Sequence, residues 1–400
     1  FSVTILTSTG SVLGDIQHEW TPKSLKNNTG IAFQGCITRG LGFVLTPEHA
    51  EEMLEADPRN SEVIFPYLNG QDLNSDPSQN PSRWAINFWD WAEERAKTYE
   101  LPYLHVLKHV KPDRHRFKKD GSFVCAEPLR NEWWLYEGRR SGLFHAIGRG
   151  HHFEKHPKGW DKEKSPLDRV LAVTRVSKTL AFSFVPAGIV FSDATVAFSL
   201  NGYDDFAVLQ SGLYAPFAWQ NSSRLKSDLR YSPTDALESF AFPDVKGSEE
   251  EIRLTELGSS YDQARRDWML AEDQGLTKLY RQYHDTGDTE SRIDNLRDLH
   301  REIDLAVARA YGWDDLDLGH GYHEVPYLPE NDRVRYTISE PARIEVLRRL
   351  AELNRQRYEE EVAQGLHGQI KPAAKQHTIK NAKNQSALDL GDLLNFDMEP

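Results

Sequence analysis

The apolar residues after position 243 follow the repeat of amphipathic helices. From Leu254 to Ala271 they recur at alternating spacings of three and four, which places them on one helix face. Similar stripes predict two further helices over about 290–311 and 340–364. Such stripes usually form the core of a helical bundle, and a partner-binding surface is the alternative interpretation.

Before position 243 the pattern is different, because short strand-like runs alternate with turns and short helices. Thr46 and Pro47 fit the cap and the first position of a helix, and Asn69-Gly70 predicts a turn that leads into a polar loop. Basic, irregular sequence over 107–165 predicts a long loop excursion. The expected strands cover residues 3–6, 33–38, 84–88, 170–176, 180–185 and 195–200.

Together these patterns predict an α+β protein. A length of 400 residues favours two or three structural units. We expect a mixed α/β domain over 1–245 and an all-α helical bundle domain over 246–370. The polar sequence of 371–400 predicts a disordered or docking tail.

Charge is unevenly distributed along the chain. The net charge is −13, but residues 101–180 hold 17 Lys and Arg against 9 Asp and Glu. A positive surface on an acidic molecule is typical of a protein that binds a polyanion with one face, and a solvated basic loop is the alternative. Cys36 and Cys125 have neither metal-ligand spacing nor a disulfide framework, which favours a reducing cytoplasm. No apolar run reaches the roughly 20 residues that cross a bilayer.

The sequence lacks the common catalytic motifs. It contains no phosphate-binding loop, no GxSxG elbow and no HExxH metal motif. Asp244 and Lys246 form an acid-x-Lys pair of the kind found in nucleases, but the sequence indicates no partner acid upstream. His151, His152 and His156 could bind a metal, although a solvated loop facing DNA is the favoured interpretation. We therefore expect no catalytic residue and no metal site in this chain.

Several strings of the sequence together carry a family resemblance. They are DPRNSEVIFPYLNGQDLNS (57–75), PSRWAINFWDW (81–91), FAVLQSGLYAPFAW (206–219), DLRYSPTDALESFAFP (228–243) and LRDLHREIDLAVARAYGWDDL (296–316). In this order they resemble the specificity domain and the following helical portion of single-chain restriction-modification enzymes of the Type IIL group and their Type ISP-like relatives. The resemblance covers most of residues 30–315.

This resemblance implies a sequence-specific, double-stranded DNA recognition module of an N6-adenine DNA methyltransferase, with or without endonuclease activity. The nuclease and methyltransferase portions are not among these 400 residues, so the chain is expected to be a piece of a longer polypeptide. S-adenosylmethionine, and Mg²⁺ for a nuclease, are expected in that parent enzyme. The implied partners are double-stranded DNA and the methyltransferase domain of the same polypeptide, without a membrane, in a bacterial or archaeal cytoplasm where such systems serve phage defence.

The segment 225–231 contains the side chains expected to read bases. If it is extended, Lys226, Asp228 and Arg230 project to one side, because side chains of a strand alternate. Lys or Arg can donate to guanine O6 and N7, and Asp can accept from cytosine N4. The resemblance indicates the same segment. A Lys–Asp surface pair without a role in recognition is the alternative.

Further DNA contacts are expected outside this segment. Asp193 and Ala194 lie in a predicted turn that either admits a base edge or is an ordinary hairpin turn. Cations that contact phosphates would position the protein without specifying a sequence. The expected ones are Lys118, Lys119, Arg139, Arg140, Arg175, Lys178, Arg224, Lys278 and Arg281.

The helical part is expected to clamp the duplex from the minor-groove side, with His284 as a further contact. Two other functions compete with DNA recognition. One is a protein-interaction scaffold whose helical bundle binds a partner, and the other is a hydrolase that uses the His-rich loop.

Overall fold

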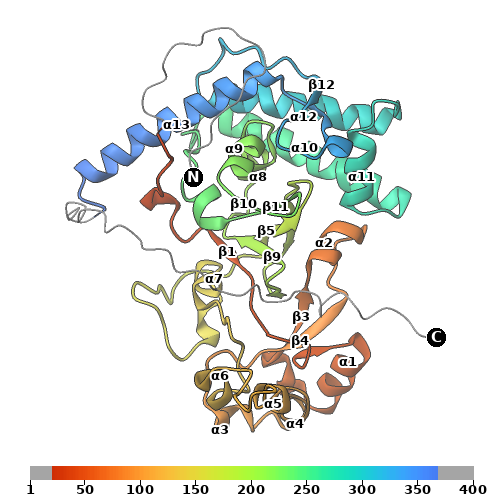
Figure 1. The fold of residues 1–400 in the computed structure, drawn as a ribbon, viewed down its shortest axis with the longest axis vertical. Helices are drawn as coiled ribbons and strands as arrows, with labels where there is room; N and C mark the ends of the chain where they lie inside the picture. Colours follow the sequence, from red (N-terminus) through yellow and green to blue (C-terminus); the bar gives the residue numbers. More distant parts are fainter. Residues whose placement is uncertain (1–19, 368–400) are drawn as a thin grey trace.

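A computed structural model describes residues 20–367 of the chain (Figure 1). Helices of the first half lie mainly in the lower lobe of this view, and the long helices of the second half lie in the upper lobe. The α-helices are α1 (Pro47–Ala56), α2 (Gly70–Ser75), α3 (Glu93–Ala96), α4 (Glu100–His109), α5 (Lys111–Arg114), α6 (Glu127–Asn131), α7 (Ser141–Ala146), α8 (Tyr203–Gln210), α9 (Tyr214–Gln220), α10 (Glu249–Glu272), α11 (Leu276–Tyr283), α12 (Ser291–Ala310) and α13 (Glu340–Ala363). This mixture of helices and small sheets confirms the predicted α+β class.

The strands form small sheets that are antiparallel, apart from one parallel pair. Their bounds are β1 (Ala32–Gln34), β2 (Val44–Leu45), β3 (Ile64–Leu68), β4 (Arg83–Ile86), β5 (Arg169–Thr174), β6 (Val176–Ser177), β7 (Ser183–Pro186), β8 (Val190–Phe191), β9 (Thr195–Phe198), β10 (Ser223–Leu225), β11 (Asp228–Arg230), β12 (Gly321–Glu324) and β13 (Val334–Thr337). The sheet orders are β1-β9-β5-β7, β2-β4-β3-β8, β10-β11-β6 and β12-β13. The parallel pair is β3 with β8.

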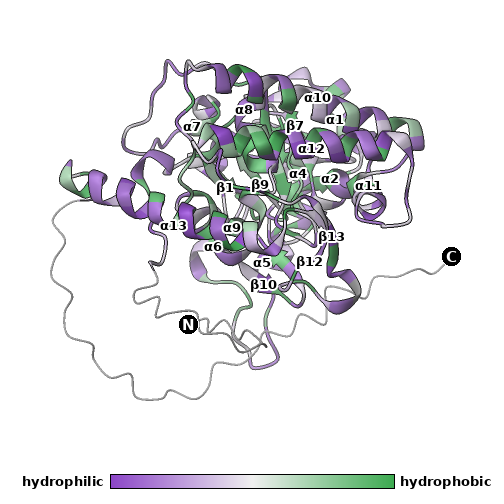
Figure 2. Cartoon of the chain, turned by 90° about the horizontal axis from the view of Figure 1, so that it is seen from above, coloured by the Kyte–Doolittle hydropathy of each residue, from purple (hydrophilic) through white to green (hydrophobic). Residues whose placement is uncertain are grey.

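Strands β5 and β9 separate two apolar cores. Leu171 and Val173 pack into the core beneath the helices α8 to α13, whereas Val170 and Ala172 pack into the core of the lower lobe. This division follows from the two-residue period of a strand. A strand that is covered on both faces needs a continuous apolar run, and β5 satisfies this requirement with buried side chains from Val170 onward. Figure 2 shows hydrophobic strands in the interior and many hydrophilic residues along the outer helices.

The long helices agree with the periodicity of the sequence. Helices α10, α12 and α13 cover the predicted ranges, and Ser248 caps α10 by accepting a hydrogen bond from Glu251 N. The sequence did not predict the hairpin of β12 and β13, which lies between α12 and α13. Among the described residues, no helix has both the length and the apolar character needed to cross a membrane.

Two predicted loops are wrong. The segment over 107–165 contains the end of α4 and the helices α5, α6 and α7, so it is not a structureless excursion. Asn69 does not lead into a polar loop, because its side chain caps α2 and Asp72 completes a capping box. The prediction failed in both places because these helices are too short to show a 3.6-residue period.

The predicted domain boundary near 245 falls within a continuous core. The core under the upper helices contains side chains from β5 and β9 as well as from α10, α12 and α13. The helical part therefore packs directly on the sheet. The domain limits themselves remain a prediction, and the predicted strand at 3–6 and tail over 371–400 lie outside the described residues.

Candidate nucleic-acid interface

The segment expected to read bases forms a hairpin. Leu225 pairs with Asp228, so Lys226 and Ser227 make a tight turn between β10 and β11. Lys226 has a φ of 56°, the left-handed conformation that such turns use. The expectation of one continuous strand over 225–231 is therefore wrong, and Lys226 lies outside the alternation.

Within β11 the alternation holds. Leu229 is 2% exposed and packs into the core, while Arg230 on the opposite face is exposed and Asp228 is half-buried. Strand β11 is the middle strand of its sheet, because it pairs with β10 on one side and with β6 on the other. The hairpin thus presents Asp228 and Arg230 on a strand that is held on both sides by its neighbours, and Lys226 lies at the tip of the hairpin.

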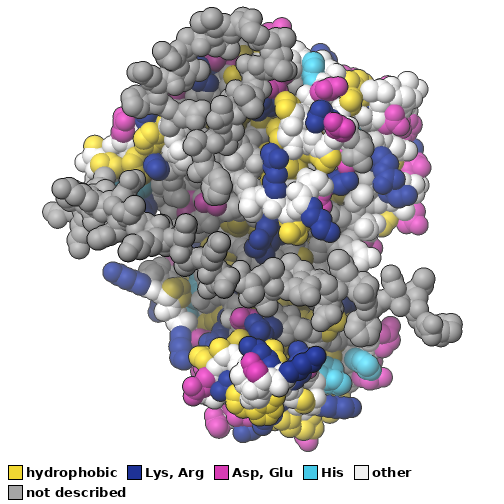
Figure 3. Space-filling view, viewed as in Figure 1, with side chains coloured by type: hydrophobic (Ala, Val, Ile, Leu, Met, Phe, Trp, Pro, Cys, Tyr) yellow, Lys and Arg dark blue, Asp and Glu magenta, His cyan; other side chains and the backbone are white. Residues whose placement is uncertain are grey.

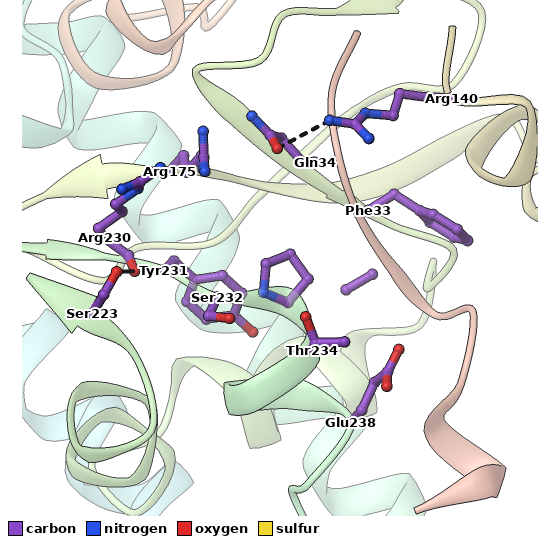
Figure 4. A pocket seen from close by; sticks show the side chains of 12 residues that line it. Phe33, Gln34, Arg140, Arg175, Ser223, Arg230, Tyr231, Ser232, Thr234 and Glu238 are labelled. Atoms are coloured by element: carbon purple, nitrogen blue, oxygen red, sulfur yellow. Dashed lines mark hydrogen bonds between the residues drawn. The ribbon is translucent and has the colours of Figure 1, made fainter. Parts of the chain in front are cut away.

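A pocket beside this hairpin brings together three arginines that are far apart in the sequence. Arg140, Arg175 and Arg230 line a cavity of about 440 Å³, together with Phe33 and Gln34 of β1 (Figure 4). The other lining residues are Ala32, Ser223, Tyr231, Ser232, Pro233, Thr234 and Glu238. Glu238 is the one carboxylate among these lining residues, so the cavity wall is predominantly cationic.

Hydrogen bonds hold Arg140 against β1. Its Nε donates to Gly35 O at 3.1 Å, and its Nη2 donates to Gln34 Oε1 at 3.0 Å. The backbone of Arg140 is left-handed, with a φ of 54°. A residue with a Cβ takes this conformation at a cost of about 1–2 kcal/mol, and the two hydrogen bonds oppose that cost.

The backbone of Arg175 joins two of the expected recognition elements. Arg175 N donates to Ala194 O at 2.8 Å, and Arg175 O accepts from Tyr231 N at 2.8 Å. The turn of Asp193 and Ala194 is exposed, and Gln34 Nε2 donates to Asp193 O at 3.1 Å. The predicted turn therefore lies next to the arginine pocket.

The arginines influence one another electrostatically. Burial lowers the pKa of Arg175, the neighbouring charges of Arg230 and Arg140 lower it further, and Asp193 opposes them. Like charges held this close favour an anion that screens them, and guanidinium groups fit phosphate or carboxylate oxygens in a bidentate manner. The pocket is therefore suited to bind an oxyanion.

The other predicted contacts are spread over several elements. Lys118 and Lys119 are exposed beside Phe117, which forms a bridge with Phe123. Arg139 is paired with Glu132, and Lys178 with Asp332. Arg224 lies on the exposed strand β10, and Lys278 and Arg281 lie on the exposed face of α11. In Figure 3, Lys and Arg side chains are spread over both lobes, and several of them lie where the lobes approach each other.

His284 does not fit the expected phosphate contact. Its Nδ1 accepts a hydrogen bond from Tyr336 N at 3.2 Å, and burial lowers its pKa well below 6.5. A neutral ring that is already bonded within the protein has little to offer a phosphate.

The three candidate histidines do not converge on one point. His152 stacks on Trp89 with ring centroids 4.2 Å apart, and burial lowers its pKa to about 4. His156 stacks on Trp160, and its Nδ1 lies 3.0 Å from His145 Nε2. Over residues 20–367 no group of three or more His, Cys, Asp or Glu side chains has the arrangement of a metal site.

The structure supplies acids that the sequence did not indicate near Asp244 and Lys246. Both residues line a second cavity of about 370 Å³ with Asp204, Asp205 and Glu251. Burial raises the pKa of Asp205 to about 7, and Asp204 and Glu251 contribute in the same direction. Proximity in the fold, and not spacing in the sequence, creates this acidic cluster.

Sequence reasoning also missed contributors to the arginine pocket. Phe33 and Gln34 belong to β1, which is placed by pairing with β9 at a separation of more than 150 residues. Glu238 follows a π-helical turn over Pro233–Leu237. No local motif marks these residues, because only the tertiary pairing brings them to the pocket.

Comparison with known proteins gives a likeness of fold. No protein-family model matches the sequence, and no curated protein matches it. Among solved structures, the chain is similar to the Type IIL restriction-modification enzyme MmeI, which was determined in complex with DNA. The TM-score is 0.53 at 15% sequence identity, over 84% of this chain and 36% of that chain. The chain thus has the fold of part of a restriction-modification enzyme and spans about a third of its length.

Proposed function

We propose that this chain is the sequence-specific, double-stranded DNA recognition module of a restriction-modification type N6-adenine DNA methyltransferase. The observation that carries the proposal is the placement of Arg140, Arg175 and Arg230 on one open pocket beside an exposed hairpin. The likeness of fold to part of a restriction-modification enzyme supports it. In this proposal the methyltransferase domain and S-adenosylmethionine belong to other parts of the polypeptide.

The proposal divides the interface into two tasks. Arg140 and Arg175 are anchored at the pocket and would hold phosphates, which position a duplex without reading it. Asp228, Arg230 and Lys226 on the hairpin, with the turn of Asp193 and Ala194, would meet base edges in the major groove. Arg140 and Arg175 line the same pocket as Arg230 of the hairpin, so a duplex could contact both sets together.

Salt dependence tests the proposal. We expect affinity for a duplex to fall by about 10³-fold between 50 and 200 mM salt if about six phosphates are contacted. Arg175→Ala should weaken binding by about 1–3 kcal/mol, since a charge-assisted contact is lost, and should reduce the salt slope by about 0.9. Duplex titrations over a salt series measure both. A chain that binds no duplex, or binds one indifferently to salt, would favour the scaffold function.

A charge exchange on the hairpin tests base reading. In the double variant Lys226→Asp and Asp228→Lys, donor and acceptor change places while the net charge stays constant. We expect the preferred base to change at one position of the bound sequence, with discrimination of about 1–3 kcal/mol. Selection from a randomised duplex pool reveals the preference. Equal weakening on all sequences would refute base reading at these positions.

A further inference from the structure

The loop between β12 and β13 packs against α9, the helix that precedes the recognition hairpin. The ring of Tyr327 in this loop packs at a tilt against Trp219 of α9, with ring centroids 5.1 Å apart, and β10 begins shortly after α9 ends. The charge of Arg224 on β10 acts on the Tyr327 hydroxyl. This part of the helical half therefore borders the proposed DNA-binding surface.

An ion pair joins the loop between β12 and β13 to the segment that follows β6. Lys178 Nζ lies 2.5 Å from Asp332 Oδ2, although the residues are 154 positions apart. Lys178 directly follows β6, whose Val176 pairs with Arg230. The ion pair thus lies at the end of the strand that neighbours the recognition strand β11.

Asp332 is surrounded by more positive charge than it can neutralise. Its Oδ1 lies 3.7 Å from Arg335 Nη2, and the charge of Arg281 on α11 also acts on it. The hydrogen bond from Lys178 is the largest cause that lowers the pKa of Asp332, and these neighbours add to it. One carboxylate therefore lies among three cations, and Glu330, which is exposed, is the other acid on the same short helical turn.

The ion pair is open to solvent. The Lys178 side chain is 51% exposed and that of Asp332 is 28% exposed. Exposed ion pairs contribute little stability, so a stronger anion can replace the carboxylate at little cost. A phosphodiester in a duplex offers negative charge and several acceptor oxygens at such a position.

We propose that Lys178, Arg281 and Arg335 form a second phosphate-binding position for duplex DNA, and that Asp332 occupies it in the free protein as an electrostatic gate. The inference rests on the proposed DNA-binding function and extends it to the helical half. When a duplex binds, a phosphate takes the place of the Asp332 carboxylate on Lys178. The carboxylate lowers affinity for any polyanion that lacks enough other contacts to displace it.

The test measures duplex binding by the 400-residue chain and its Asp332→Asn variant over a salt series. We expect Asp332→Asn to bind about 3-fold to 10-fold more tightly at 100 mM salt, because no carboxylate has to be displaced from Lys178. The salt slope should stay the same, because Lys178 contacts a phosphate in both complexes. Adding Lys178→Ala to this variant should abolish the gain. Unchanged or weaker binding by Asp332→Asn would overturn the proposal.

Two controls separate the gate from other effects. Asp315→Asn also removes a carboxylate from an ion pair, but its partner is Arg349 of α13, and we expect no change in duplex affinity. If Asp332→Asn alters the loop and lowers the melting temperature, Arg281→Ala gives an independent test. It should weaken binding about 3-fold to 10-fold and reduce the slope by about 1, and an unchanged affinity would refute the second position.

The outcomes also distinguish the two proposals. If neither the parent chain nor Asp332→Asn binds a duplex, the proposed function fails together with the gate. If the parent chain binds with the expected salt dependence but Asp332→Asn gains nothing, the gate alone is wrong.

Discussion

Arg140 combines an unfavourable backbone conformation with a position on the arginine pocket. Its φ of 54° is readily adopted by glycine, whereas other residues adopt it at a cost. Its guanidinium is nevertheless held by Gly35 O and Gln34 Oε1 on β1. These two hydrogen bonds of the side chain therefore oppose the cost of the left-handed backbone.

A pair of substitutions at Arg140 separates these two effects. Arg140→Gly and Arg140→Ala both remove the guanidinium, so both should weaken duplex binding by the same amount, about 1–3 kcal/mol. Arg140→Gly should be more stable than Arg140→Ala by about 1 kcal/mol, because only glycine relieves the left-handed backbone. Urea unfolding and duplex titration of both variants check this. Equal stability of the two would contradict the assigned strain.

Asp205 makes stability depend on pH. Its pKa is raised from 3.8 to about 7, mainly by burial. Between these values the folded state retains a proton that the unfolded state has released, so stability falls as the pH rises from about 4 to about 7. The loss of stability is complete once the pH is above about 7, the pKa of Asp205 in the folded state.

Replacement of Asp205 by Asn should remove this dependence. Asp205 is half-buried and lies in the first turn of α8, where negative charge is favoured, so we expect a modest gain of about 1 kcal/mol over the parent chain at pH 8. At pH 4 the two proteins should unfold alike. Denaturant unfolding at both pH values measures the difference, and an equal gain at pH 4 would rule out titration as the cause.

At the scale of elements, α13 holds the first described residues of the chain, 20–26, by hydrogen bonds. Asn354 is fully buried and accepts from Trp20 Nε1 at 2.7 Å and from Lys23 N at 2.9 Å. Its Nδ2 donates to Lys23 O and to Ser239 O. About two turns further along α13, Glu361 accepts from Lys26 N. The two ends of the described chain are therefore held together by polar contacts.

Loss of Asn354 should loosen this attachment. Asn354→Ala removes one buried hydrogen bond, to Ser239 O, and three partly buried ones, to Trp20 Nε1 and to the backbone of Lys23, so we expect a loss of about 2–4 kcal/mol in the free energy of unfolding. Gln356→Ala, at an exposed position of the same helix, should change it by less than about 0.5 kcal/mol. Denaturant unfolding of both variants tests this, and similar small effects would show that the attachment contributes little.

The sequence predicts those elements whose apolar residues repeat regularly over several turns of one continuous segment. Helices α10, α12 and α13 each present several turns of apolar spacing, and their predicted ranges are confirmed. The hairpin of β10 and β11 has strands of three residues, which are too short for a two-residue period to be recognised. The sequence therefore predicts Lys226 in a strand, although it lies in the turn. Predicted contacts such as Arg175 and Arg230 do meet in the structure, but Gln34 could not be predicted, because its position depends on pairing between β1 and β9.

At the scale of the whole molecule, the sheet and the long helices share one core. Leu254 of α10 is fully buried in the same core as Leu171 of β5 and Phe198 of β9. Neither part can bury its apolar surface without the other. The two parts should therefore unfold together.

A substitution that creates a cavity at α10 tests whether the sheet and the long helices unfold together. Leu254→Ala should cost about 2–5 kcal/mol, and we expect the amides of β5 and β9 to lose protection against hydrogen exchange to the same extent as those of α10. Hydrogen exchange resolved along the chain measures this. Unfolding of α10 at a free energy well below that of β5 would contradict a single cooperative unit.

The backbone of Arg175 has a consequence for attempts to reprogramme the protein. Because its N–H holds Ala194 and its carbonyl holds Tyr231, a bulkier side chain at one element shifts the main chain that carries the other. Under the proposed function, substitutions at 194 and at 228–230 would then change the preferred bases non-additively, and a library that varies both sites at once should yield new specificities that stepwise changes miss.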